Sequence, residues 1–403
     1  MNISIKDNMN IFVGDSDYEL VERKGVGHPD TMCDSIAERA SRNYSKYCLK
    51  EFGNPANHWF DKVMLIGGEA DVDYGRGVII KPYTIIFAGK VSYYVGKSKI
   101  PVDQILYQSV SEVLGEVLTG FVPEEHMRII NKLVDYQGAG RSNGRYRPES
   151  INELPSIEND KLVSNDCNLL SGYAPLTTLE AVVLETERYI NGKKFKLENP
   201  DTGWDVKLFG RRKLEKIELL VNMPFLAKDI FSLQQYFDRK EDVSNQIQAF
   251  INERFHINIE LSMNATDKNG KPYLTALGSV ADTGDVGVVG RGNRMNGLIT
   301  PMRPMSIEAP AGKNPIDHTG KIYGVLVSDM AEKIHELTNC PVDVHIYTAK
   351  ESTLNNPDEV IIKICGWDSN IEEEKKIIKL VNEMVNDVGE ISKRIILQGV
   401  EMW

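Results

Sequence analysis

The chain has 403 residues, of which 41% are hydrophobic and 26% charged, and its formal net charge is −11. This length exceeds one ordinary hydrophobic core, so two or three structural units are expected. The acidic balance argues against nucleic acid as a partner, because proteins that bind its backbone usually present a basic face. No apolar run is long enough to cross a bilayer, so we expect no membrane partner.

The start of the chain and its cysteines both favour a cytoplasmic location. MNISIKDNMN lacks the basic region and apolar core of a signal peptide. The five cysteines are scattered and form no C-x-x-C pair, which favours reduced thiols over zinc or disulfides.

Residues 1–135 are predicted to form a β-rich α/β unit. Apolar residues recur at helical spacing over 31–52, and Thr31 followed by Asp34 fits a capping box. The GHPD tetrapeptide 27–30 then lies immediately before a helix start. The remaining elements expected here are strands at 62–66 and 77–88, a helix at 102–118 and a strand at 127–134.

Two further units are predicted at 136–270 and 271–403. The second opens with a polar, turn-rich excursion at 136–164. It should then contain a helix at 175–189, strands at 204–209 and 216–221, a helix at 229–253 and a strand at 257–263. The third should contain a segment at 273–278, helices at 315–337 and 369–388, and strands at 342–348 and 359–365. Helices do not alternate strictly with strands, which favours an α+β fold with mixed or antiparallel sheets.

The 281–321 segment is the most unusual stretch of the chain. It carries seven glycines, four prolines and five fixed cations, with almost no regular periodicity. Glycines allow close backbone approach to a ligand, and Arg and Lys side chains bind phosphate oxygens. Asn314-Pro315 indicates a helix start, which itself favours anions. We interpret the segment as a triphosphate-binding loop; the alternative is a charged surface loop.

The common nucleotide and hydrolase motifs are absent. The sequence contains no G-x-x-x-x-G-K-[ST], no G-x-G-x-x-G after a predicted strand, no H-E-x-x-H and no G-x-S-x-G. An enzyme built on this chain would therefore work by positioning and electrostatics, without a covalent nucleophile.

Several polar residues near the predicted helix starts could carry chemistry, each with a plain structural alternative. His28 could donate a hydrogen bond to an oxygen that gains charge, or be an ordinary surface histidine. Asp30 could bind Mg²⁺ or simply cap the helix. Asp317 and Lys321 are four residues apart and could form a structural ion pair. Asp285 and Asp166 could be turn residues, and Lys207 could point to solvent from its strand.

Five segments together resemble the S-adenosylmethionine synthetases (methionine adenosyltransferases) of the archaeal type. They are VERKGVGHPDTMCDSIAE, LIGGEADVDYG, SGYAPLTTLEAVVLETERYIN, VGRGNRMNGLITPMRPMSIEA and AGKNPIDHTGKIYG, in the expected order between about residues 21 and 325. The resemblance implies three similar α/β units about a pseudo-threefold axis, partly interleaved along the chain. It also implies an active site between two subunits, and hence at least a homodimer.

The resemblance implies a specific reaction. The sulfur of L-methionine attacks the ribose 5′ carbon of ATP in line, the triphosphate leaves, and it is hydrolysed to phosphate and diphosphate. A thioether is already a nucleophile, which agrees with the missing catalytic triad. The departing negative charge would be met by fixed cations and Mg²⁺.

The resemblance also implies roles for individual residues. His28 would contact the leaving oxygen and Asp30 would bind Mg²⁺. The phosphates would be held by Lys207, Arg291 and Lys313, and the methionine and adenosine groups by Asp166 and Asp285. Further expected contacts are Arg294, His318 and Lys321 to substrate, Asp317 to a second Mg²⁺ and Glu69 to K⁺.

The chain departs from the bacterial and eukaryotic branch at a few positions. Gly292 follows Arg291 where that branch has lysine, and Arg294 is expected to substitute for it. The piece DYQGAGRSNGRYRP also differs from the usual archaeal pattern. Two other functions therefore stay open at this point: a catalytically inactive nucleotide-binding regulatory paralogue, and a tripolyphosphate hydrolase.

Overall fold

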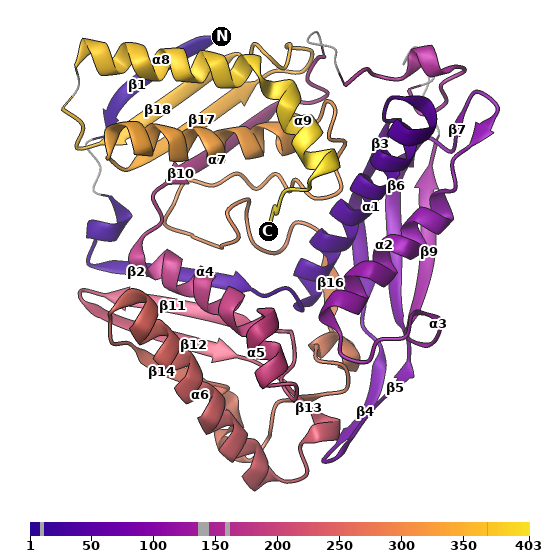
Figure 1. Cartoon of the computed structure of the whole chain (residues 1–403), viewed down its shortest axis with the longest axis vertical. Helices are drawn as coiled ribbons and strands as arrows, with labels where there is room; N and C mark the ends of the chain where they lie inside the picture. Colours follow the sequence, from indigo (N-terminus) through magenta and orange to yellow (C-terminus); the bar gives the residue numbers. More distant parts are fainter. Residues whose placement is uncertain (9–11, 136–144, 158–161, 369) are drawn as a thin grey trace.

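The computed structural model describes residues 1–8, 12–135, 145–157, 162–368 and 370–403, and its main feature is three four-stranded mixed sheets (Figure 1). The expected mixture of helices and mixed sheets is therefore confirmed. Figure 1 shows the sheets and their helices around a centre into which the C-terminal end of the chain runs. One cluster of buried apolar residues accompanies each sheet.

The first sheet has the order β16-β3-β6-β9 and is packed against α1 and α2. Its elements are α1 (Pro29–Phe52), β3 (His58–Ile66), β6 (Tyr83–Val91), α2 (Val102–Val117), β9 (Met127–Val134) and β16 (Val286–Val288). The strand β16 comes from far along the chain and pairs antiparallel with β3. This pairing brings the 281–321 segment to the start of α1.

The second sheet has the order β14-β12-β11-β2 and is packed against α4 and α6. Its elements are β2 (Tyr18–Lys24), α4 (Thr178–Ile190), β11 (Lys207–Lys213), β12 (Lys216–Asn222), α6 (Leu233–Phe255) and β14 (Glu260–Met263). Because β2 ends at Lys24 beside Lys207 of β11, the chain enters α1 next to that lysine.

The third sheet has the order β1-β18-β17-β10 and is packed against α7, α8 and α9. Its elements are β1 (Asn2–Asn8), β10 (Asn168–Ala174), α7 (Thr319–Thr338), β17 (Val342–Thr348), β18 (Glu359–Cys365), α8 (Ile371–Asn386) and α9 (Val388–Leu397). The short elements outside the large sheets are β4 (Glu69–Asp73), β5 (Arg76–Lys81), β7 (Tyr94–Val95), β8 (Ser98–Lys99), α3 (Pro123–His126), α5 (Lys193–Glu198), β13 (Phe225–Leu226) and β15 (Leu274–Thr275).

The structure corrects several sequence predictions. The strand predicted at 77–88 is two strands, because Pro82 separates β5 from β6 and has no amide hydrogen to donate. The helix predicted from Pro315 begins only at Thr319. Asn314 does not cap it, because its carboxamide accepts from the Ile316 amide at 3.3 Å and donates to Asn57 at 3.0 Å. The strands β1, β2 and β16 and the helix α9 were not predicted.

Each sheet also presents apolar side chains on the face opposite its buried one. Burial alternates along β2 and β11, so that Leu20 and Phe209 are exposed between buried neighbours, and Tyr18 is exposed at the start of β2. The corresponding exposed residues of the other two sheets are Met64, Ile66, Ile130, Val134, Leu169 and Tyr347. Among the described residues, no helix is long and apolar enough to cross a bilayer.

Candidate active site

The start of α1 is built around His28, which is the N-cap of that helix. Its Nδ1 accepts a hydrogen bond from the Asp30 amide at 3.1 Å. Burial lowers the pKa of His28 to about 4, and the nearby Lys24 and Lys207 charges act in the same direction. A neutral imidazole that accepts at Nδ1 carries its hydrogen on Nε2. His28 is thus set up as a hydrogen-bond donor through Nε2.

The capping box predicted at Thr31 and Asp34 is wrong, because both side chains have partners elsewhere. The Thr31 hydroxyl donates to the carbonyl of Lys24 at 3.1 Å. An Asp34 oxygen accepts from the Gly290 amide at 2.8 Å. Helix α1 therefore begins two residues before the predicted position, at Pro29.

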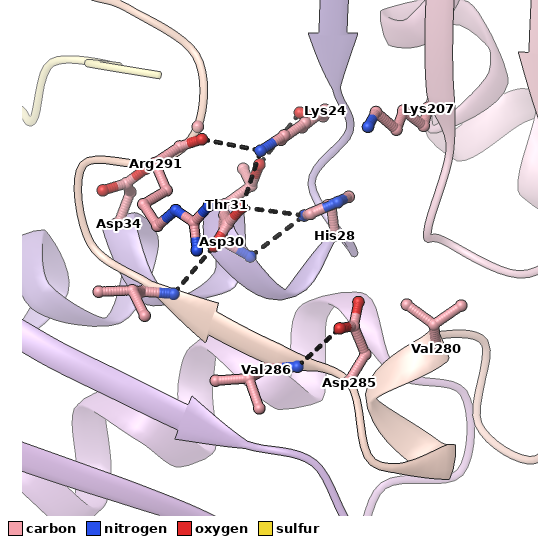
Figure 2. Close-up of polar contacts among 12 residues, drawn as sticks. Lys24, His28, Asp30, Thr31, Asp34, Lys207, Val280, Asp285, Val286 and Arg291 are labelled. Atoms are coloured by element: carbon pink, nitrogen blue, oxygen red, sulfur yellow. Dashed lines mark hydrogen bonds and ion pairs between the residues drawn. The ribbon is translucent and has the colours of Figure 1, made fainter.

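Asp30 connects the helix start to the 281–321 segment. One carboxylate oxygen accepts from the Val288 amide at 2.9 Å, and the other lies 2.8 Å from the Lys24 ammonium (Figure 2). Strand β16 approaches so closely that a Cβ on Gly287 would lie 2.0 Å from the Pro29 carbonyl oxygen. Only glycine can take that position without moving the backbone.

Two cations and a second carboxylate complete this group, which we call the α1 cluster (His28, Asp30, Lys207, Asp285 and Arg291; Figure 2). Arg291 is exposed, and its guanidinium has no hydrogen bond or ion pair within the described residues. Lys207 lies 3.1 Å from Glu22. The Asp285 carboxylate accepts only from the Val286 amide, at 2.9 Å, in the described part of the chain. The cluster therefore keeps positive charge and one carboxylate open to a ligand.

A second group lies at the start of α7 and is called the α7 cluster (Lys313, Asp317, His318 and Lys321). His318 is the N-cap, and its Nδ1 accepts from the Gly320 amide at 3.1 Å. Burial lowers its pKa to about 3, helped by Lys313. His318 repeats the arrangement of His28: a neutral imidazole caps a helix through Nδ1.

The two lysines of the α7 cluster are buried and paired with carboxylates. Lys313 lies 3.0 Å from Asp61 and 2.6 Å from Glu308. Burial works to lower the pKa of Lys313, but these two carboxylates outweigh it and raise that pKa. Lys321 lies 2.5 Å from Glu38, and the exposed fractions of the two side chains are 0% and 7%. Burial lowers the pKa of Lys321 against the opposing effect of Glu38.

The alternative considered for Asp317 and Lys321, an ion pair between them, is not found, because Lys321 pairs with Glu38. Asp317 precedes α7 and pairs with Arg145 through one oxygen, while its other oxygen, Oδ1, is buried and has no partner within the described residues. The Asn165 amide donates to the Asp317 carbonyl at 3.3 Å, which places the exposed Asp166 next to this cluster. Part of the polar excursion at 136–164 before it, namely 136–144 and 158–161, lies outside the described residues.

Two other predicted residues, Arg294 and Glu69, and a further cation of the 281–321 segment, Arg303, have different surroundings. The Arg294 guanidinium folds back onto its own segment and donates to the carbonyls of Gly290 at 2.8 Å and Gly292 at 3.0 Å. Arg303 is buried and lies 3.0 Å from Glu180. Glu69 is exposed on β4 and is paired with Lys81.

Sequence reasoning missed the acidic partners of the cations, above all Glu38 and Asp61. It also missed Asn293, whose carboxamide accepts from the Lys24 amide at 2.9 Å and donates to the Lys24 carbonyl at 2.7 Å. One signal was available, because Asp30, Asp34 and Glu38 are four residues apart and must share one face of a helix.

An exposed arginine, a neutral histidine donor and carboxylates lie together at this helix start, an arrangement that suits a highly charged anionic ligand. The S-adenosylmethionine synthetase (AdoMet synthetase) family model matches residues 1–399. The chain is 36% identical over 405 residues to the S-adenosylmethionine synthase of Aeropyrum pernix, with 97% of each chain covered. It is 37% identical over 410 residues to that of Saccharolobus solfataricus, with 99% of this chain and 98% of the relative covered. The chain belongs to the S-adenosylmethionine synthetase family, and its resemblance to archaeal members is confirmed.

One solved structure agrees at the level of the fold. An S-adenosylmethionine synthetase from Campylobacter jejuni, described as unusual, superimposes with a TM-score of 0.59 over 94% of each chain. Its sequence identity is only 13%, so this likeness supports the fold alone.

Proposed function

We propose that this family member makes S-adenosyl-L-methionine from ATP and L-methionine. The methionine sulfur attacks the ribose 5′ carbon in line, the C5′–O bond breaks, and the triphosphate leaves and is hydrolysed to phosphate and diphosphate. The observation that carries the proposal is the exposed Arg291 guanidinium, which has no partner within the described residues, together with the partly exposed Lys207 at the start of α1, where His28 is the cap. Positive charge fixed before the reaction stabilises an anion that forms in the transition state.

His28 contacts the leaving oxygen in this proposal. A thioether needs no general base, so the imidazole is not required to remove a proton. With Nδ1 occupied as the helix cap, its Nε2 hydrogen is available to the ribose oxygen as negative charge develops there. The depressed pKa keeps His28 neutral at pH 7, so its donor role does not depend on protonation.

The remaining residues divide between the two ends of the substrates. Arg291, Lys207 and Lys313 hold the triphosphate, with Arg294 and His318 contributing at its edge. The fully buried Lys321 supports this edge only through its ion pair with Glu38. Asp285 and Asp166 bind the methionine ammonium and adenosine groups, since a carboxylate also favours the new sulfonium charge. Both carboxylates accept only backbone amides among the hydrogen bonds of the described chain, which supports a ligand-binding role.

Magnesium fits the α1 cluster as an ion held mainly by substrate. Mg²⁺ is usually bound by one or two carboxylates together with phosphate oxygens and water. Asp30 supplies one carboxylate once the Lys24 ammonium moves away from it, and Asp317 has the unpartnered Oδ1 for a second ion. Bound Mg²⁺ would neutralise the departing triphosphate charge. Potassium at Glu69 would require Lys81 to move away.

We further propose that the active site is completed by a second copy of this chain. The exposed apolar residues on the outer sheet faces favour burial against another protein surface. In such a dimer, the α1 cluster of one protomer would face the α7 cluster of its partner. A measurement of the mass of the purified protein in solution gives the size of the oligomer.

The three-unit organisation belongs to this proposal as well. Each sheet has the same pairing pattern across its strands, two antiparallel pairs followed by one parallel pair. That common pattern supports a pseudo-threefold relation. Because β1 and β16 join sheets built mainly from other parts of the chain, the units 1–135, 136–270 and 271–403 are interleaved. The free cysteines support a cytoplasmic location.

The activity is tested with purified protein, ATP, L-methionine, Mg²⁺ and K⁺. We expect a sulfonium product by mass spectrometry in equal amount to released phosphate and diphosphate, and a strong loss of all three in Arg291→Ala. ATP binding without turnover would instead identify a regulatory paralogue. Hydrolysis of tripolyphosphate without any sulfonium product would identify a hydrolase.

A further inference from the structure

Helix α1 holds the 281–321 segment at three points along one face. Asp30, Asp34 and Glu38 follow one another at four-residue spacing, so their side chains lie on the same side of the helix. Each accepts a backbone amide of the segment: Val288 to Asp30 at 2.9 Å, Gly290 to Asp34 at 2.8 Å and Gly312 to Glu38 at 3.0 Å. Asp30 and Glu38 also pair with lysines. Asp34 forms no ion pair within the described residues.

The backbone is fixed on both sides of Arg291, next to Asp34. Asp34 holds the amide of Gly290, which has a φ of +83° that favours glycine. The Arg294 guanidinium donates a hydrogen bond to the Gly290 carbonyl at 2.8 Å. The Lys24 ammonium donates to the Arg291 carbonyl, also at 2.8 Å. The backbone of Arg291 is therefore restrained while its guanidinium stays exposed.

On its other side this part of the segment borders a cavity. Gly290, Asn293 and Arg294 line a cavity of about 530 Å³ that extends to the C-terminal Trp403. The hydrogen bond that Asp34, only 3% exposed, accepts from the Gly290 amide is one of the contacts, with those of Lys24 and Arg294, that fix the segment at Arg291 beside this cavity.

We propose that Asp34 is a positioning residue for the reaction, which acts through the Gly290 amide to aim Arg291 at the departing triphosphate. This inference rests on the proposed role of Arg291. Burial raises the pKa of Asp34 to about 7, against the effect of the Gly290 amide. Because the protonated acid keeps a carbonyl oxygen, the acceptor survives loss of the charge. The geometry requires an acceptor at this position and not a charge.

The test compares Asp34→Ala, which removes the acceptor, with Asp34→Asn, which keeps it. Loss of positioning by about 1 Å can cost roughly a hundredfold in rate. We expect Asp34→Ala to lower kcat by about ten- to a hundredfold with little change in the KM for methionine, and Asp34→Asn to stay within about threefold of the wild type. Equal losses in both variants would overturn the inference.

A double-mutant cycle shows whether Asp34 acts through Arg291. We expect Asp34→Ala to change kcat by less than about threefold once Arg291→Ala is present, because the group it aims is gone. Calorimetry with tripolyphosphate as the probe should show the same non-additivity. Equal effects in both backgrounds would contradict the inference while leaving the proposed function intact. Full activity of Arg291→Ala alone would contradict the proposed role of Arg291 itself. If Asp34→Ala does not fold, Asp34→Ser replaces it. The serine side chain is one bond shorter than that of aspartate, so its hydroxyl does not reach the Gly290 amide.

Discussion

The two helix starts share one construction but differ in how their charges are balanced. Both α1 and α7 begin at a neutral histidine that accepts the second amide of its helix through Nδ1. At α1, Arg291 is exposed and has no ionic partner in the described chain. At α7, Lys321 is fully buried against Glu38. The α1 cluster offers charge to a ligand, whereas much of the charge of the α7 cluster is neutralised within the fold.

The comparison predicts the largest loss of stability for Lys321→Ala. Removing one partner of a buried ion pair leaves the other charge uncompensated, which typically costs about 3–5 kcal/mol. Denaturant unfolding of the variant should show this loss in the free energy of unfolding. Replacing Lys321 and Glu38 together by Met and Leu should recover much of it. If Lys321→Ala alone is as stable as the wild type, the ion pair with Glu38 does not stabilise the fold, and the contrast with the open charge of Arg291 fails.

Arg291→Ala should have the opposite profile. Losing one preorganised donor to a developing anion lowers kcat by about a hundred- to a thousandfold, whereas an exposed loop cation contributes less than about 1 kcal/mol to stability. Steady-state kinetics and a melting curve on the same preparation check both halves. Retained activity with a large drop in melting temperature would reverse the assignment.

The capping histidines predict a dependence of stability on pH. The pKa of His318 is about 3 in the folded chain, below the value of roughly 6.5 for an unfolded histidine. The unfolded chain therefore binds more protons below about pH 6.5, and stability is lost as pH falls from there towards the folded pKa. His318→Asn keeps a capping side chain but does not titrate. Between pH 7.5 and 5, the wild type should lose more stability than this variant. If the free energies of unfolding of the two proteins fall in parallel with pH, His318 is not the cause of the loss.

The smallest effect is expected for Glu22→Gln. Glu22 lies 3.1 Å from Lys207, and the exposed fractions of the two side chains are 25% and 31%. A partly exposed pair of this kind contributes at most about 1 kcal/mol, so stability should barely change. Affinity for tripolyphosphate should rise, because Lys207 loses its counter-charge. Calorimetry that finds weaker binding would indicate that Lys207 does not face the anion.

The sequence was most informative where local signals decide the structure. Helical periodicity located α1, and the density of glycines and cations singled out the 281–321 segment. It was least informative where distant contacts decide. Pro315 and Asn314 are a strong local helix signal, yet α7 starts at Thr319 because Asn314 bonds elsewhere and His318 takes the cap.

The same limit applies to the candidate site. The residue types of the site were predictable, but the sequence did not show which cations are paired with carboxylates and which are open to a ligand. Lys313, Lys321 and Arg291 look alike in the sequence, and only the fold brings Asp61 and Glu38 to the two lysines. The three-residue strand β16 has too few residues for any periodicity, yet it carries the chain past the start of α1, where Asp30 accepts the Val288 amide.

The most direct test of the account is a crystal structure with a non-hydrolysable ATP analogue and L-methionine. The account predicts the triphosphate against the Arg291 guanidinium and the Lys207 ammonium, with the ribose 5′ oxygen facing Nε2 of His28. A nucleotide bound with its phosphates away from these three side chains would contradict it.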